Sequence, residues 1–257
     1  MAARWIHDGV WMVGSGTDTV ALTDPHDCHS YLVQDGDGNG LVVDAGTGLG
    51  AEQWVQNISE VCEPSRIVAV VLTHYHADHA GATHIAIARG MEVYGSRPTA
   101  LAIMRGDETR TQLKRAREVG LYPSSYNLMP AGPVIAIRDG QLVRAGLIRI
   151  RALAAPGHCD GHMVYLLDLG DAVILFAGDA FFAGGRVSIQ PIPDCRVDRY
   201  AATATRLGKL PVDIMLSGHG EAVVANAQRD LLVAAECFDR FTLPPNLQAG
   251  THRGRQS

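Results

Sequence analysis

The side chains best suited to chemistry lie in one short segment, Thr-His-Tyr-His-Ala-Asp-His, which begins at Thr73. Within it, His74, His76, Asp78 and His79 crowd four titratable groups into six positions. Burying such groups without partners is costly, and a metal ion removes that cost because imidazole nitrogens and carboxylate oxygens are its ligands. Alternate residues of an extended segment point to the same side, so His74 and His76 can share one metal. Asp78 and His79 follow a bend and can face another, so the spacing favours a two-metal site.

The elements expected around this segment place it at the carboxyl end of a strand. Residues 66–72 are apolar and β-branched, which is typical of a buried strand, and residues 79–89 have a helical pattern. Further strands are expected at residues 5–13, 30–34, 41–44, 92–94, 147–154, 163–168, 172–176 and 214–216. Further helices are expected at residues 51–62, 108–119, 197–208 and 227–241, and a frayed tail at 250–257. Strands and helices occur in both halves, which predicts a mixed α and β class with helices covering sheets.

The composition excludes several function classes. The 257 residues carry 22 Lys plus Arg against 27 Asp plus Glu, and this acidic balance without a basic run argues against a nucleic-acid partner. No apolar run approaches the ~20 residues of a membrane span, and the N-terminus has no apolar signal-peptide core. The five cysteines are odd in number and widely spaced, which favours free thiols in a reducing compartment. We therefore expect a cytoplasmic globular protein without a membrane partner.

Two glycine-rich stretches imitate ligand-binding loops. Residues 46–51 match a loose dinucleotide-binding pattern, but the next strand ends at His74 and lacks the acidic residue that such a site requires. Residues 35–40 imitate the start of a calcium loop, but Gly46 stands where the bidentate glutamate would be. A hairpin turn between residues 30–34 and 41–44 explains residues 35–40 better.

Together with four further motifs, the histidine segment resembles the signature of the metallo-β-lactamase superfamily, in its glyoxalase II- and lactonase-like branch. The motifs follow in the family's order: Val-Val-Asp44-Ala-Gly, Pro-Gly-His158-Cys-Asp-Gly-His162, Ala-Gly-Asp179-Ala and Ser-Gly-His219-Gly. The resemblance covers about residues 5–225. It implies an α+β fold, an αββα sandwich in which two β-sheets pack face to face between helices. Residues 1–257 would then form a single domain with the metal site at one edge of the sandwich.

The resemblance also implies a role for each motif residue. The first metal would be held by His74, His76 and His158, the second by Asp78, His79 and His219, with Asp179 and a water or hydroxide bridging both and Asp44 accepting a hydrogen bond from a ligand imidazole. Two dications about 3.5–4 Å apart lower the pKa of a shared water and stabilise attacking and leaving atoms. Zinc is the expected metal, and the ligand set also suits iron or manganese. Asp78 can accept the proton of the water.

The resemblance narrows the reaction to hydrolysis of an ester-like bond in a small molecule: a thioester, a lactone or a related acyl compound. Asp179 argues against β-lactam hydrolysis, because β-lactamases with this second-metal set generally lack the bridging aspartate. Phe182 stands where acyl-homoserine lactonases carry a tyrosine. Few residues follow His219, fewer than the C-terminal helical domain of glyoxalase II requires.

A second class of enzyme shares this resemblance. Persulfide dioxygenases have a similar fold but bind a single iron, through positions that correspond to His74, His158 and Asp179. The remaining ligands would then be redundant, so their presence favours the dinuclear hydrolase.

Candidate substrate contacts lie outside the ligand motifs. Phe181 and Phe182 follow the bridging aspartate and could form an apolar pocket wall, although alternation makes one of them ordinary core. Arg186 could meet a substrate carboxylate or form a surface salt bridge. His162 is expected to be a hydrogen-bonded structural residue.

The loose pattern of residues 98–146 indicates a lid over the site, or else an external helix packed on the sandwich or a contact in a homodimer. If the segment is a lid, Tyr122 or Tyr126 lies within reach of a bound acyl group. His26, Asp27 and His29 precede a strand that starts near the site's rim in similar proteins, so they are candidates for a role in the pocket.

Overall fold

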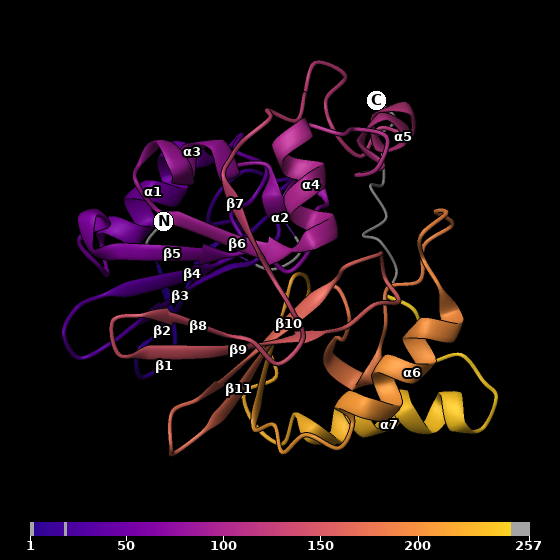
Figure 1. Cartoon of the computed structure of the whole chain (residues 1–257). Coiled ribbons are helices and arrows are strands. Elements are labelled where there is room, and N and C mark those ends of the chain that lie inside the picture. The colour runs from indigo at the N-terminus through magenta and orange to yellow at the C-terminus, as the bar shows by residue number, and fades with distance from the viewer. Residues whose placement is uncertain (1–2, 18–19, 248–257) are drawn as a thin grey trace.

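The chain folds into two β-sheets that pack face to face, with helices on both outer faces (Figure 1). The computed structural model describes residues 3–17 and 20–247. The first sheet has seven strands in the order β1-β2-β3-β4-β5-β6-β7, and the second has five in the order β12-β11-β10-β9-β8. This arrangement is the αββα sandwich predicted from the motifs.

The strands of the first sheet are β1 (Arg4–His7), β2 (Val10–Gly14), β3 (Ser30–Gln34), β4 (Gly40–Val43), β5 (Ile67–Val71), β6 (Glu92–Ser96) and β7 (Val134–Ile137). Those of the second are β8 (Leu142–Ala145), β9 (Ile148–Ala154), β10 (Met163–Asp168), β11 (Val173–Gly178) and β12 (Ile214–Ser217). The helices that lie by the first sheet are α1 (Ala51–Ser59), α2 (Ala77–Ala80), α3 (Thr83–Ala88), α4 (Arg97–Arg105) and α5 (Leu113–Glu118). The second sheet is covered by α6 (Val197–Leu207) and α7 (Gln228–Asp239).

Strand β5 shows how the sequence builds these layers. Its run Ile-Val-Ala-Val-Val is apolar throughout because both of its faces are buried. Ala69 and Val71 point into the core between the sheets, where Tyr165 also packs. Val70 points the other way, into the core beneath the helices, beside Trp54 of α1. A third core lies between the second sheet and the helices α6 and α7.

The parallel strands place their carboxyl ends together at one edge of the sandwich. β5 pairs in parallel with β4 and β6 in the first sheet, and β11 pairs in parallel with β12 in the second. The segments that leave β5, β11 and β12 carry three of the motifs. This edge therefore collects side chains from both sheets.

Two predicted elements differ in detail from the structure: the strand at residues 5–13 and the helix at residues 79–89. Residues 5–13 form the two strands of a hairpin, β1 and β2, because Gly9 adopts a left-handed φ of +75° and turns the chain. In place of the single helix expected at residues 79–89, the chain forms the short helices α2 and α3, with a break that begins at Gly81. A Cβ at Gly81 would collide with the carbonyl oxygen of Thr47, so the residue permits a close approach of two loops.

Residues 98–146 are more regular than the sequence suggested. They contain most of α4, all of α5, and the strands β7 and β8. β7 completes the first sheet and β8 belongs to the second, so this segment carries the chain from one sheet to the other. Its longest stretch without helix or strand lies between α5 and β7. The tail expected at residues 250–257 lies outside the described residues.

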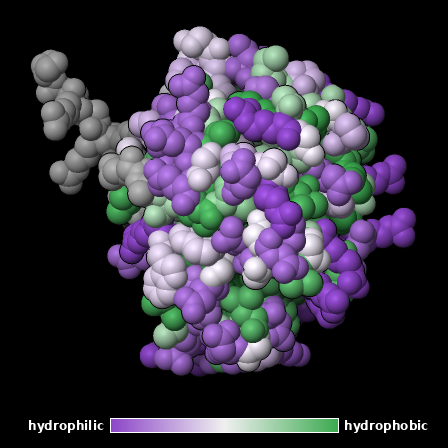
Figure 2. All heavy atoms as spheres, turned by 90° about the vertical axis from the view of Figure 1, so that its left-hand side faces the viewer, coloured by the Kyte–Doolittle hydropathy of each residue, from purple (hydrophilic) through white to green (hydrophobic). Residues whose placement is uncertain are grey.

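The surface is mixed in character. Figure 2 shows the face on the left of Figure 1, where hydrophobic residues form small groups between hydrophilic ones. Such a pattern is typical of a surface that faces water. Within the described ranges, no helix combines the length and the apolar character needed to cross a membrane. The five cysteines are free, as predicted.

Candidate metal centre

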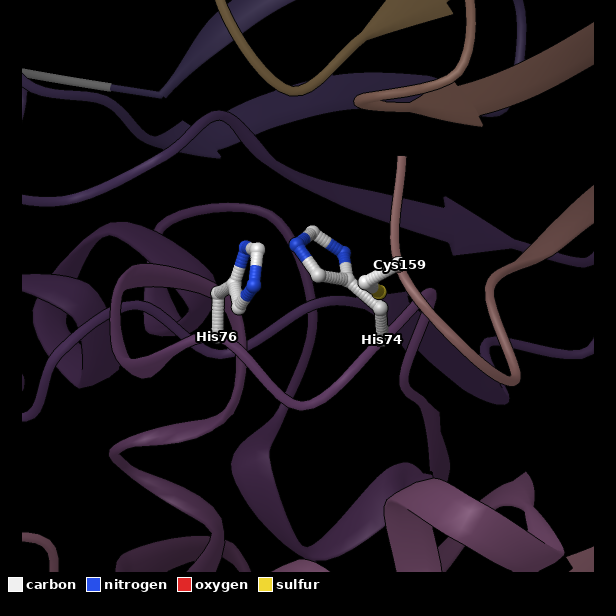
Figure 3. A group of neighbouring side chains, drawn as sticks. All are labelled: His74, His76 and Cys159. Atoms are coloured by element: carbon white, nitrogen blue, oxygen red, sulfur yellow. The ribbon is translucent and has the colours of Figure 1, made fainter. Parts of the chain in front are cut away.

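The histidine segment leaves β5 at the edge where the two sheets meet. The imidazoles of His74 and His76 extend to the same side of this segment, as the alternation predicted (Figure 3). Their ring centroids are 4.5 Å apart. Both residues are buried, as is His79, which lies in helix α2. The strand end and the following helical turn thus aim several imidazoles into one interior space.

The second sheet supplies the other candidate ligands from loops far away in the sequence. His158 follows β9, Asp179 follows β11 and His219 follows β12. Nε2 of His158 lies 3.0 Å from Nδ1 of His76, and Nε2 of His219 lies 3.1 Å from Oδ2 of Asp78. The structure therefore brings residues of all the distant motifs to the histidine segment.

The spacing of these ligand atoms suits bound metal ions. In a tetrahedral zinc shell with bonds of about 2.1 Å, neighbouring ligand atoms lie about 3.4 Å apart. Asp179 stands between the two groups: Oδ1 lies 3.3 Å from Nε2 of His79 and 3.7 Å from Nε2 of His219, while Oδ2 lies 3.6 Å from Nε2 of His158. A carboxylate in this place can serve two metals at once. Groups of three side chains with ligand atoms within 4.8 Å of one another include His74, His79 and Asp179.

Several of these atoms lack any hydrogen-bond partner. Nε2 of His74, Nε2 of His79 and Oδ1 of Asp179 are buried without one. A buried polar atom left unsatisfied costs roughly 1–3 kcal/mol, so three together are unusual in a stable core. A cation between them would satisfy all three, and the residues present therefore fit a metal centre.

The imidazoles of the first group are kept neutral by their surroundings. Burial, and then the imidazole of His79, lower the pKa of His74 well below its ordinary value. Burial and the neighbouring ring of His158 lower the pKa of His76 to about 4. A neutral imidazole retains the lone pair that a metal requires. These side chains are therefore in the protonation state of ligands at neutral pH.

The carboxylates of Asp78 and Asp179 are kept ionised by the imidazoles beside them. Burial alone would raise the pKa of Asp78, but the imidazoles of His79 and His219 outweigh it and hold that pKa below its ordinary value. Burial is likewise outweighed at Asp179, where His219 and His79 hold the pKa well below its usual range. Both acids therefore offer charged oxygens to a cation.

Outer hydrogen bonds fix the ligand tautomers. Nδ1 of His79 donates to Oδ2 of Asp44 at 2.8 Å, and Nδ1 of His158 donates to the carbonyl oxygen of Ser188 at 2.9 Å. Each bond leaves Nε2 free to face the centre. Asp44 also accepts hydrogen bonds from the backbone and the hydroxyl of Thr73, at 2.7 and 2.8 Å. The sequence analysis gave Thr73 no role, although its position directly before the first ligand, His74, could have indicated one.

Two buried cysteines also approach the centre. Cys159 has its sulfur within 4.8 Å of ligand atoms of His74 and His76 (Figure 3), and Cys28 forms a similar group with Asp44 and His79. Burial raises the pKa of the Cys159 thiol well above its ordinary value. A protonated thiol is a poor ligand, so the imidazole of His158 is the better third ligand for the first metal.

Of the two tyrosines, Tyr122 contacts a candidate ligand directly, and Tyr126 lies behind it. The hydroxyl of Tyr122 donates to Oδ1 of Asp78 at 2.9 Å. Tyr126 stacks on Tyr122, with ring centroids 5.5 Å apart, and its hydroxyl donates to the carbonyl oxygen of Thr47 at 2.8 Å. The stretch between α5 and β7 therefore covers the side of the centre occupied by Asp78.

The other predicted substrate contacts are not brought to the centre in the same way. Phe181 is a core residue that packs edge-on against Tyr200 of α6, which is the role that alternation left open for one of the two phenylalanines. Phe182 is also buried, and its backbone pairs with that of Arg186. The guanidinium of Arg186 donates to the carbonyl oxygen of Ala183, three residues earlier.

The residues expected at the rim of the site contact the loops around it. Asp27 accepts hydrogen bonds from the backbone and the hydroxyl of Thr47, at 2.6 and 2.5 Å. The backbone of His29 donates to Gly218 beside His219, and His26 lies 6.0 Å from the ring of Tyr122. His162 is structural, as predicted, since its Nε2 accepts the backbone N–H of Asp179.

Comparison with known proteins identifies the family behind this geometry. A sequence profile described as the metallo-beta-lactamase superfamily matches residues 23–219. The chain belongs to the metallo-β-lactamase superfamily. The matched range holds every candidate ligand, from His74 to His219.

Curated relatives within the superfamily are distant. An atrochrysone carboxyl ACP thioesterase from Aspergillus fumigatus is 27% identical over 191 residues, which cover 74% of this chain and 49% of the relative. A hydroxyacylglutathione hydrolase from Cupriavidus metallidurans is 28% identical over 164 residues, covering 62% of this chain and 51% of the relative. The chain thus spans about half the length of these relatives.

Solved structures confirm the superfamily fold. A metallo-β-lactamase from Cronobacter sakazakii superposes with a TM-score of 0.71 over 94% of this chain and 96% of its own, at 22% identity. A metallo-β-lactamase family protein from Thermus thermophilus gives 0.70 over 92% and 81%, at 20% identity. At such identities the likeness speaks for the fold alone.

Proposed function

We propose that this protein is a dinuclear metal-dependent hydrolase that cleaves an ester-like bond in a small acyl substrate, with a thioester as the first choice. One observation carries the proposal: Asp179 stands between two sets of candidate ligands, with its oxygens 3.3–3.7 Å from Nε2 of His79, His158 and His219. A carboxylate so placed suits a pair of metals bridged by one side chain.

The relatives support the choice of bond. They include proteins named as a thioesterase and as a hydroxyacylglutathione hydrolase, at 26% and 28% identity. Both names describe hydrolases of acyl compounds. A thioester is therefore favoured over a lactone or a β-lactam for this chain.

The candidate ligands divide the work between holding metals and handling a proton. When bound, two divalent ions, zinc by preference, would lower the pKa of a shared water and polarise the acyl oxygen. The first would be held by His74, His76 and His158, the second by Asp78, His79 and His219, with Asp179 between them. Asp78, which lies beside His219, would also accept the proton of the attacking water. Asp44 keeps the tautomer of His79 that leaves Nε2 free.

Metal content and substrate choice test this proposal together. Elemental analysis of the purified protein should give close to two metals per chain. A panel of acyl thioesters, lactones, simple esters and a β-lactam should show the highest kcat/KM for a thioester. A His7→Ala variant, which alters a histidine on β1, should behave as the parent does. A single iron per chain, with oxygen consumption on a persulfide, would overturn the hydrolase and establish a dioxygenase.

A further inference from the structure

Among the hydrogen bonds of the described residues, one joins the stretch between α5 and β7 to a candidate metal ligand. That bond is made by Tyr122. Its hydroxyl donates to Oδ1 of Asp78 at 2.9 Å. The other carboxylate oxygen, Oδ2, lies 3.1 Å from Nε2 of His219 and 3.6 Å from Nε2 of His79. The two oxygens of Asp78 thus have different partners: one faces the tyrosine and the other faces the centre.

The phenol is held in place from several sides. Its ring stacks on Tyr126 at an interplanar angle of 29°, and the hydroxyl of Tyr126 is anchored on the carbonyl oxygen of Thr47. Thr47 is fixed in turn by Asp27, which accepts both its backbone N–H and its hydroxyl. Because each of these groups is tied to another loop, the Tyr122 hydroxyl reaches Asp78 with little conformational freedom left to lose.

A carboxylate can bind a cation through one oxygen or through both, and it can rotate between these modes. A hydrogen bond to Oδ1 occupies that oxygen and stops the rotation, which leaves Oδ2 as the single ligand atom. We infer that Tyr122 is a positioning residue that holds Asp78 as a one-oxygen ligand of the second metal and so raises the affinity of that position. The role rests on the proposed two-metal function.

The effect should be selective for one metal. The first set of ligands is oriented by other groups: His158 by the carbonyl oxygen of Ser188, and His74 by the hydroxyl of Thr73 at 3.0 Å. Neither group contacts Tyr122 in the hydrogen bonds of the described residues. Loss of the phenol hydroxyl should therefore weaken the second position and spare the first.

Stepwise metal release from the loaded protein tests this inference. The parent, Tyr122→Phe and Tyr94→Phe would each be loaded with zinc and titrated with a coloured chelator that reports both dissociation constants. Tyr122→Phe should weaken the second zinc by 10–100-fold, the usual effect of losing a partner of a metal ligand, and leave the first unchanged. Tyr94→Phe is the matched control: it removes a phenol hydroxyl that donates to the carboxylate of Glu92 on β6, and it should keep both affinities.

The phenylalanine ring preserves the stacking on Tyr126, so circular dichroism and the Tm of the loaded variant should stay near those of the parent. Hydrolysis by Tyr122→Phe should fall at limiting zinc and recover in excess zinc. Two metals in the parent with an unchanged second affinity in Tyr122→Phe would overturn the role of Tyr122 alone. Equal weakening by both tyrosine variants would overturn it as well. A parent that binds only one metal would overturn the proposed function and this role with it.

Discussion

The two candidate metal positions are built from different chemistry. The first uses three imidazoles, those of His74, His76 and His158, which burial keeps neutral, with a smaller contribution from neighbouring rings at His74 and His76. The second combines two imidazoles with the carboxylate of Asp78, which nearby imidazoles keep charged. Asp179 lies between the two positions and belongs to both.

The outer partners differ as well. In the first set, the carbonyl oxygen of Ser188 orients His158, and the hydroxyl of Thr73, which also donates to Asp44, lies beside His74. The second set depends on two side chains, Asp44 beside His79 and Tyr122 beside Asp78. Among these partners, only Tyr122 contacts a ligand of the second position without also contacting Thr73.

The largest effect should come from damage to the first position. His76→Ala should lower kcat/KM by roughly 10³-fold or more, because metal charge stabilises the transition state by several kcal/mol. Elemental analysis should show one metal lost and the other retained. Loss of both metals would contradict this distinction between the two positions, since they would then not bind metal independently.

A smaller effect is expected at the second position. Asp78→Ala should lower kcat by at least ~10²-fold, the usual scale of general acid–base work, while circular dichroism stays close to that of the parent. The matched control is Asp198→Ala, which removes an exposed carboxylate at the start of α6. Full activity of Asp78→Ala would show that another group accepts the proton.

The smallest of these effects is expected at Asp44, which contacts the candidate ligand His79 and is not itself a ligand. Asp44→Asn retains a side chain of the same shape but weakens the hydrogen bond that orients His79. The affinity for the second metal should fall by 10–100-fold and that for the first by less. Chelator competition measures both values, and equal losses at the two positions would contradict the assignment of Asp44 to the second.

The sequence predicted the αββα architecture and the superfamily, and both are confirmed by the structure and the comparisons. This success has a physical reason: four ligands in six residues, followed by motifs at strand ends, leave few alternatives to a metal centre. Local turns were harder to predict. The hairpin at Gly9 and the break at Gly81 depend on a backbone conformation and on a loop contact that periodicity does not report.

Contacts between distant segments were the least predictable part. The sequence offered Tyr122 or Tyr126 as a substrate contact if their segment is a lid, but it did not predict the hydrogen bonds that they make to Asp78 and Thr47. Cys159 was treated as an ordinary buried thiol, yet it lies beside His74 and His76. Phe181 packs in the core against Tyr200 of α6. Each outcome depends on how loops pack, and no local pattern encodes that.

The placement of the ligands on both sheets has a consequence for how the chain is made. Residues such as His74 leave the ribosome early, but His158 and Asp179 follow much later and His219 comes only after β12. A nascent chain therefore cannot close the centre until nearly the whole sandwich has been synthesised. Because such long-range contacts form slowly, metal uptake should be a late step that marks a finished fold. Metal bound to the native state alone would then stabilise the two sheets against separation by mass action.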